Sequence, residues 1–279
     1  MFDNSKIENL PPLREIIAQN DLRATKSLGQ NFLCDLNLTR KIARQADIAP
    51  SDHIIEIGPG PGGLTRGILL ENAAHLTAIE FDERAVRALQ SLDDVTDDRL
   101  NLIHGDALKG NMLDYGDNGN RKIIANLPYN IATPLIINWL AQIHANGVDA
   151  YQSITIMVQK EVAERMAASD NTKPYGRLSV LVQWLCDARI CFDVPATAFV
   201  PPPKVTSSII QLTPKKRYDD IAFKKIEKLT EMAFGQRRKM IRQTMKPHIQ
   251  VINDLGIDET KRAENLSVTD FLNIAKAIV

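Results

Sequence analysis

A glycine-rich loop follows a short apolar segment, and this pairing restricts the possible fold more than any other feature of the sequence. Residues 53–58 read HIIEIG, and Gly58, Gly60 and Gly63 then form a GxGxxG pattern ahead of a segment with helical periodicity. Glycine allows a sharp backbone turn and a close approach to a ligand. The pattern predicts a strand, loop and helix of a parallel α/β sheet, with a ligand at the carboxyl end of the strand.

Alternating strand and helix patterns continue along the chain. Further strands are predicted at 75–80, 99–107, 121–126, 153–158, 188–194 and 207–212. Helices are predicted at 11–20, 36–46, 62–73, 82–92, 133–145, 159–168 and 177–187, with Asp82 as an N-cap and Thr133 opening its helix. This alternation favours right-handed crossovers in a mostly parallel sheet, with the two late strands paired antiparallel at one edge.

The pattern changes near residue 214. A charged linker begins at Thr213, and helices alone are predicted beyond it, at 222–234, 237–248 and 268–279. We therefore expect a catalytic α/β domain over residues 1–213 and a small helical domain over 214–279.

The charge of the chain is balanced overall but unevenly distributed. The 279 residues hold 34 Lys and Arg against 34 Asp and Glu, and 44% hydrophobic residues exclude a disordered or disulfide-stapled chain. Residues 201–250 alone hold 12 basic against 4 acidic residues. A basic run is often only a solvated surface, but this one, which includes Arg237, Arg238, Lys239 and Arg242 on a predicted helix, would also suit a polyanion.

Cysteines and the chain start indicate a reducing compartment. Cys34, Cys186 and Cys191 have no Cys or His neighbours at zinc-site spacing, and no signal sequence or long apolar stretch is present. We expect a cytoplasmic protein without a metal site.

Two acidic residues follow strands next to the glycine loop. Glu80 ends the second strand, where a carboxylate can accept hydrogen bonds from both hydroxyls of a ribose, and Asp106 follows the third, where it can accept one from an adenine amino group. An adenosine cofactor is therefore predicted, either NAD or S-adenosylmethionine. Pro59 and Pro61 remove N–H donors that a pyrophosphate would use, which mildly favours S-adenosylmethionine.

The fourth strand runs into Asn126-Leu127-Pro128-Tyr129. An amide oxygen of Asn126 and the carbonyl of Leu127 can each accept a hydrogen from an exocyclic amine, which favours the pyramidal geometry in which its lone pair attacks. Tyr129 offers a ring on which a base can stack. The tetrapeptide predicts methyl transfer to a planar amine.

A second aromatic precedes a proline-rich loop. Phe199 stands before Pro201, Pro202 and Pro203, which would hold the loop extended, and Lys204 follows. Phe199 would cover the other face of a flipped base and Lys204 would approach a phosphate, although a buried core Phe would give the same pattern.

These motifs together resemble the ribosomal RNA adenine dimethyltransferase family, and within it the bacterial small-subunit branch. The resemblance rests on SLGQNFL, EIGPGPGGLT, GDAL, NLPYNIATPLI, MVQKEVAERM, YGRLSVL and FVPPPKVTSSI, which span nearly the whole chain. It implies a Rossmann-like methyltransferase fold with a helical C-terminal domain. It also implies S-adenosylmethionine contacts at Asn31, Leu33, Gly58, Glu80, Asp106 and Asn126.

The resemblance further implies a substrate. The expected reaction is dimethylation of two adjacent adenosines in the hairpin near the 3′ end of 16S rRNA, within a nearly assembled small subunit, by a monomer. In this setting the GQNFL segment fits a flap, in which Gln30 and Asn31 bind the methionine end of the cofactor while Phe32 and Leu33 exclude water.

Other functions share parts of the pattern. A non-catalytic rRNA-binding assembly factor could keep the basic surface, a DNA or protein-glutamine methyltransferase could share the Asn-x-Pro-Tyr motif, and an NAD-dependent oxidoreductase could share the glycine loop. The polymer that accepts methyl groups, and the cofactor that binds, distinguish these possibilities.

Overall fold

The computed structural model describes residues 2–20, 22, 31–216 and 219–278, and the chain forms two compact units. Unit 1 comprises Met1–Lys160 and Arg189–Pro214, and unit 2 comprises Glu161–Ala188 and Lys215–Val279. The last boundary between the units, after Pro214, lies one residue beyond the predicted domain boundary. Residues 161–188, however, belong to unit 2 rather than to a continuous domain over 1–213. The ring centroids of Trp184 and Phe223 lie 6.2 Å apart in a stacked pair, so residues 161–188 contact the C-terminal helices within unit 2.

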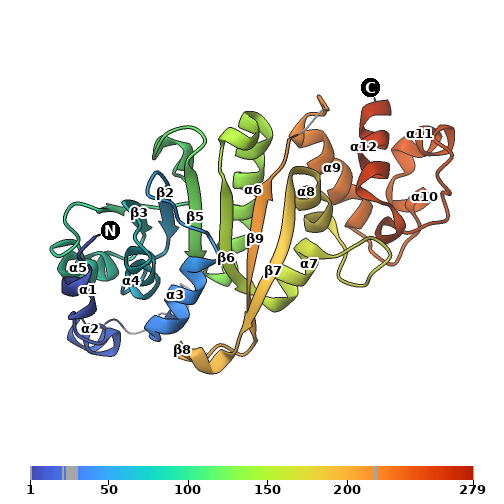
Figure 1. The fold of residues 1–279 in the computed structure, drawn as a ribbon. Helices are drawn as coiled ribbons and strands as arrows, with labels where there is room; N and C mark the ends of the chain where they lie inside the picture. Colours follow the sequence, from blue (N-terminus) through green and yellow to red (C-terminus); the bar gives the residue numbers. More distant parts are fainter. Residues whose placement is uncertain (1, 21, 23–30, 217–218, 279) are drawn as a thin grey trace. The chain divides into compact units, whose positions relative to one another are not determined.

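Unit 1 is built on a mixed sheet (Figure 1). In the described part of the chain seven strands lie in the order β4-β3-β2-β5-β6-β9-β7. Their bounds are β2 His53–Ile57, β3 His75–Glu80, β4 Leu100–His104, β5 Arg121–Asn126, β6 Ser153–Gln159, β7 Cys186–Val194 and β9 Ser207–Pro214. The pairs β2–β3, β2–β5, β3–β4 and β5–β6 are parallel, and β9 runs antiparallel to β6. The predicted Rossmann-like architecture is confirmed.

The central strands are apolar almost throughout because both faces of a parallel sheet are covered. Ile54, Ile55, Ile123, Ile124 and Ile156 are fully buried. The flanking helices are α1 Ser5–Glu8, α2 Leu13–Gln19, α3 Leu36–Arg44, α4 Gly63–Leu70, α5 Glu83–Asp93 and α6 Tyr129–Asn146. Asp82 caps α5 as predicted, since its Oδ1 accepts a hydrogen bond from the Arg84 backbone N–H at 3.1 Å.

The prediction that Thr133 opens a helix is wrong. Helix α6 begins four residues earlier, at Tyr129, where the backbone N–H groups of Ile131 and Ala132 donate to the Pro128 carbonyl. Pro134 therefore lies inside the helix, where it removes one backbone hydrogen bond near the start. The Asn-Leu-Pro-Tyr motif consequently forms the junction between β5 and α6.

A small second sheet joins two segments that are far apart in sequence. Strand β1 (Phe32–Leu33) pairs antiparallel with β8 (Phe199–Val200), and Leu33 stands opposite Phe199. The Phe32–Leu33 and Phe199–Val200 parts of two predicted motifs are therefore neighbours at this point of unit 1.

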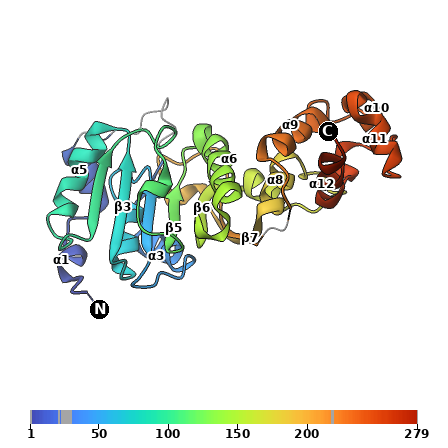
Figure 2. The same cartoon turned by 90° about the horizontal axis from the view of Figure 1, so that it is seen from above.

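Unit 2 is helical, and Figure 2 shows its C-terminal helices from above. Its elements are α7 Lys160–Ala167, α8 Arg177–Leu185, α9 Phe223–Phe234, α10 Ile241–Thr244, α11 Ile249–Asp254 and α12 Val268–Ala277. The rings of Phe234 and Phe271 stack in its core at 5.7 Å. Among the described residues, no helix has both the length and the apolar character needed to cross a membrane.

The predicted continuous helix over 237–248 is wrong. Only Ile241–Thr244 is α-helical, because the preceding residues pair with a remote segment: Met240 bridges Arg262, and the Ile241 N–H donates to the Lys261 carbonyl at 2.8 Å. The basic residues of this segment therefore lie largely on a turn.

Gly63 allows close packing between β1 and the start of α4. A Cβ placed there would lie 2.3 Å from the Leu33 carbonyl oxygen. We expect Gly63→Ala to lower the free energy of unfolding by about 1–3 kcal/mol, since the backbone of β1 must move. Gly105→Ala is the control, because its Cβ would meet nothing closer than 3.8 Å. Chemical denaturation measures both, and equal losses would contradict this account of Gly63.

Candidate active site

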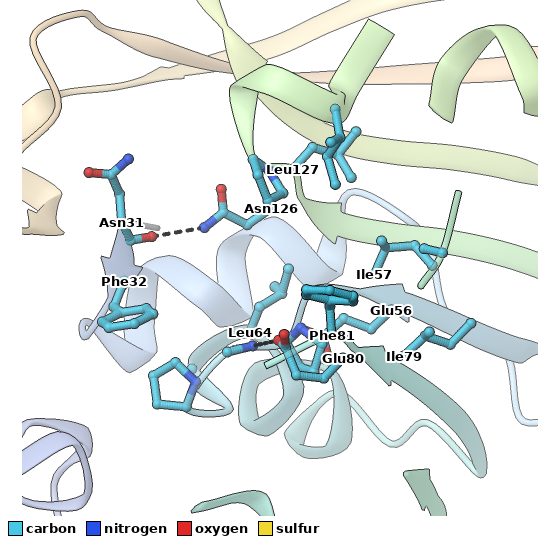
Figure 3. A pocket seen from close by; sticks show the side chains of 18 of the residues that line it. Asn31, Phe32, Glu56, Ile57, Leu64, Ile79, Glu80, Phe81, Asn126 and Leu127 are labelled. Carbon is cyan, nitrogen blue, oxygen red and sulfur yellow. Dashed lines mark hydrogen bonds between the residues drawn. The ribbon is translucent and has the colours of Figure 1, made fainter. Parts of the chain in front are cut away.

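The predicted cofactor and catalytic residues gather around a single cavity. It has a volume of about 280 Å³ and lies at the carboxyl ends of β2, β3, β4 and β5 (Figure 3). Its lining includes Asn31, Leu33, Gly58, Gly60, Glu80, Asp106, Asn126, Leu127, Tyr129 and Phe199. The predicted contact of Gln30 lies outside the described residues.

The glycine loop and Glu80 form one wall. Gly58 and Gly60 have φ values of 65° and 56°, which side-chain-bearing residues rarely adopt. The Gly60 N–H donates to Glu80 Oε2 at 2.9 Å, and the Asp82 N–H donates to Oε1 at 2.8 Å. These two bonds fix a carboxylate that is 5% exposed, and its oxygens can accept more than one hydrogen bond each. Burial raises the pKa of Glu80, although the backbone donors partly oppose this.

Asp106 lies two residues beyond the end of β4 and lines the cavity together with two apolar side chains. Its Oδ1 accepts a hydrogen bond from the Leu108 N–H at 3.0 Å. Phe81, which is 63% exposed, and Leu108 also line the cavity. The sequence analysis missed Phe81, although an aromatic residue directly after the acidic end of a strand was an available signal. Asp106, Phe81 and Leu108 therefore contribute one carboxylate and two apolar side chains to the lining of the cavity.

Asn126 is oriented by the N-terminal segment. Its Nδ2 donates to the backbone carbonyl of Asn31 at 3.2 Å, as Figure 3 shows. With the amide nitrogen engaged there, Oδ1 is left as an acceptor for another group. The Leu127 N–H donates to the Met157 carbonyl at 3.2 Å, which holds the next peptide against β6.

Phe199 lies both in the core and on the cavity, and its predicted contact with a flipped base stays a prediction. It is 3% exposed and belongs to the core of unit 1, yet it also lines the cavity. Tyr129 lines the cavity from the first turn of α6, and its hydroxyl lies 2.8 Å from Ser207 Oγ. Two aromatic residues therefore border the same space.

Glu56 is a buried acid in the cavity lining that the sequence analysis did not single out. It is 1% exposed, and its Oε2 has no hydrogen-bond partner among the described residues. Burial raises the pKa of Glu56 to about 8, the charge of Glu80 adds to this, and the Thr65 hydroxyl partly offsets it. An acidic residue inside an apolar strand was the signal that could have identified it.

The predicted RNA-binding residues differ in their surroundings. Lys204 is exposed on the loop between β8 and β9, and Arg238 and Lys239 are exposed with no ion pair within the described ranges. Arg242 lies 4.0 Å from Glu259. Arg237 instead forms an ion pair with Glu264 at 3.0 Å and donates to the carbonyls of Lys173 and Tyr175. Its guanidinium is therefore already bonded within unit 2.

No metal centre can be built from the residues that the structure describes, because no three His, Cys, Asp or Glu side chains gather among them. The three cysteines are free thiols.

The raised pKa of Glu56 predicts a pH-dependent stability. The native state keeps this proton above pH 4.5, where the unfolded chain loses it, so the free energy of unfolding falls by about 1.4 kcal/mol per pH unit up to about pH 8. Glu56→Gln removes this titration. We therefore expect the difference in thermal midpoint, variant minus wild type, to increase as the pH rises towards 8. Glu83→Gln, at an exposed site, is the control. Parallel pH curves for Glu56→Gln and wild type would contradict the prediction.

Comparison with known proteins identifies the family. The profile of the family described as "Ribosomal RNA adenine dimethylase" matches residues 21–279. A protein of Rhizobium johnstonii named ribosomal RNA small subunit methyltransferase A is 48% identical over 274 residues, covering 98% of this chain and 99% of the relative. A protein of the same name from Azorhizobium caulinodans is 47% identical, with 98% and 94% covered.

Solved structures agree with these relatives. A dimethyladenosine transferase from Plasmodium falciparum superposes with a TM-score of 0.74 at 27% identity, covering 86% of this chain and 94% of that one. The 23S rRNA methyltransferase ErmE, at 20% identity and a TM-score of 0.65, shares the fold, with 89% and 99% covered. The family predicted from the motifs is confirmed, and the chain belongs to the ribosomal RNA adenine dimethylases.

Proposed function

We propose that this chain transfers methyl groups from S-adenosylmethionine to the exocyclic amino groups of two adjacent adenosines in the 3′-terminal hairpin of 16S rRNA, within the small ribosomal subunit. The observation that carries the proposal is the position of Asn126, Leu127 and Tyr129 on the same cavity as the glycine loop and Glu80. The names of the relatives support the choice of small-subunit rRNA.

The cavity suits an adenosine cofactor without phosphates. Glu80 offers fixed acceptors for ribose hydroxyls, Asp106 offers an acceptor for an amino group, and Phe81 and Leu108 supply apolar surface for a ring. Pro59 and Pro61 also line the cavity and provide no N–H donors, which does not suit the pyrophosphate of NAD. The orphaned Oε2 of the buried Glu56 is a further polar atom in this lining, and a carboxyl that keeps its proton can donate as well as accept a hydrogen bond.

The bound cofactor supplies a methyl group on a positively charged sulfur, and its leaving group departs as a neutral thioether. The protein must then align the amine and make its lone pair available. Asn126 Oδ1 and the Leu127 carbonyl accept the two hydrogens of the adenine amine, which favours a pyramidal nitrogen. Alignment of this kind accounts for large rate gains, with effective molarities of about 10⁵–10⁸ M.

The target base needs support outside its helix. Tyr129 and Phe199 border the cavity and offer aromatic surface, and stacking of one base on such a ring contributes about 1–3 kcal/mol. Each transfer forms an N–C bond as the sulfur–methyl bond breaks, and the methylated nitrogen then releases one proton to solvent. After the first transfer, the monomethylated amine retains one hydrogen, which either acceptor can bind while the lone pair attacks again. The two acceptors are therefore compatible with dimethylation.

Basic surface on both units would contact the RNA backbone. Lys204 lies in unit 1, and Arg238, Lys239 and Arg242 lie in unit 2. We assign residues 214–279, all but the first of which belong to unit 2, to RNA binding. We infer a monomeric enzyme that acts in the cytoplasm, where small subunits assemble, and contributes to their biogenesis.

Transfer of a radiolabelled methyl group to small subunits tests the proposal. Subunits isolated without these methyl groups should accept label from S-adenosylmethionine when the chain is added. Binding to the subunits without any incorporation would instead indicate the alternative, a non-catalytic assembly factor.

Asn126→Ala should separate cofactor binding from chemistry. The variant loses one of the two acceptors for the amine, and we expect methyl transfer to fall by at least about 10²-fold. Calorimetry should still detect S-adenosylmethionine binding, weakened but measurable, because Glu80 and Asp106 are intact. Undiminished turnover would contradict the assigned role of Asn126.

The basic residues near position 238 should divide into two classes. Arg238→Ala combined with Lys239→Ala should weaken RNA binding and reduce the slope of log affinity against log salt by about 1–2, since each lost phosphate contact contributes about 0.7–0.9. Arg237→Ala should mainly lower the thermal midpoint, because Arg237 is bonded within unit 2. An unchanged salt slope in the double variant would show that this surface is only solvated.

A further inference from the structure

The Tyr129 ring is held at both ends. Its Cα lies in the first turn of α6, and its hydroxyl is hydrogen-bonded to Ser207 Oγ at 2.8 Å. Ser207 is fully buried, whereas Tyr129 is partly exposed where it lines the cavity. The orientation of the ring is therefore set within the protein, before any base arrives.

Ser207 lies at a well-anchored point of the sheet. It is the first residue of β9 and stands opposite Gln159 of β6. The preceding residue, Thr206, accepts a backbone hydrogen bond from Lys160 at 3.0 Å. The start of β9 thus provides a fixed partner for the Tyr129 hydroxyl.

The next residue, Ser208, also holds the start of β9 in place, and it can be compared directly with Ser207. Its Oγ donates to Asp193 Oδ1 at 2.6 Å, and Asp193 Oδ2 pairs with Lys160 Nζ at 2.6 Å. Successive side chains of a strand point to opposite faces. Ser208 therefore binds Asp193 within the sheet, whereas Ser207 binds Tyr129 on the side of the cavity. Both serines are fully buried, and they differ in which group they bind.

We infer that Ser207 is a positioning residue for methyl transfer, acting through the ring of Tyr129. This inference rests on the proposed function. A ring fixed in one plane holds the stacked adenine so that its amine meets Asn126 Oδ1 and the Leu127 carbonyl together. Without the bond from Ser207, the ring turns about its side-chain torsions and the amine loses alignment, and misplacements of about 1 Å can cost up to 10²-fold in rate.

The test compares Ser207→Ala, Tyr129→Phe and their combination in methyl transfer to small subunits at saturating S-adenosylmethionine. We expect each single variant to lower kcat about tenfold with little change in cofactor affinity by calorimetry. The double variant should be no slower than either single one, because both changes remove the same hydrogen bond. Ser207→Thr, which keeps the hydroxyl, should restore most of the activity.

Ser208→Ala is the matched control, since it also removes a buried hydroxyl from β9. We expect it to lower thermal stability at least as much as Ser207→Ala while retaining wild-type kcat. A wild-type kcat in Ser207→Ala, multiplying effects in the double variant, or an equal loss of kcat in Ser208→Ala would overturn the inference. Wild-type protein that fails to methylate small subunits would instead overturn the proposed function.

Discussion

The parallel alignment of β2 with β3 and β5 is the constraint on which the rest of the structure depends. Because these strands run in the same direction, their carboxyl ends and that of β4 meet at one edge of the sheet. The glycine loop, Glu80, Asp106 and Asn126 each lie at or just beyond one of these ends, so residues spread over about seventy positions of the sequence line one cavity. Antiparallel pairing would have sent half of them to the opposite edge.

Two remote segments complete this edge. Strand β1 brings the Asn31 carbonyl to the amide of Asn126, and β8 brings Phe199 beside Leu33. The orientation of Asn126 therefore depends on the N-terminal segment, and the aromatic border of the cavity depends on a strand that begins near residue 199. The chemistry proposed for residues 126–129 thus depends on two segments, near residues 31 and 199, that are far from them in the sequence.

Features fixed by local backbone chemistry could be predicted, and those fixed by remote packing could not. The loop from Gly58 needs positive φ values, and Asp82 caps its own helix, so both could be recognised from nearby residues alone. The turn around Met240 depends on pairing with Arg262, and helix α8 packs through Trp184 against Phe223. The spacing of hydrophobic residues in the sequence gives no sign of either contact. Arg237 carries the same charge as Arg238 and Lys239, yet its guanidinium donates to carbonyls of residues more than sixty positions away in the sequence.

Mass spectrometry of RNase fragments of the modified RNA measures most directly what this site does. Small subunits lacking these methyl groups would be incubated with the chain and S-adenosylmethionine, and their 16S rRNA digested and sequenced by mass. We predict two neighbouring adenosines near the 3′ end, each carrying two methyl groups on its exocyclic nitrogen. Methyl groups on a ribose, on another base or on a ribosomal protein, with these adenosines unmodified, would contradict the account.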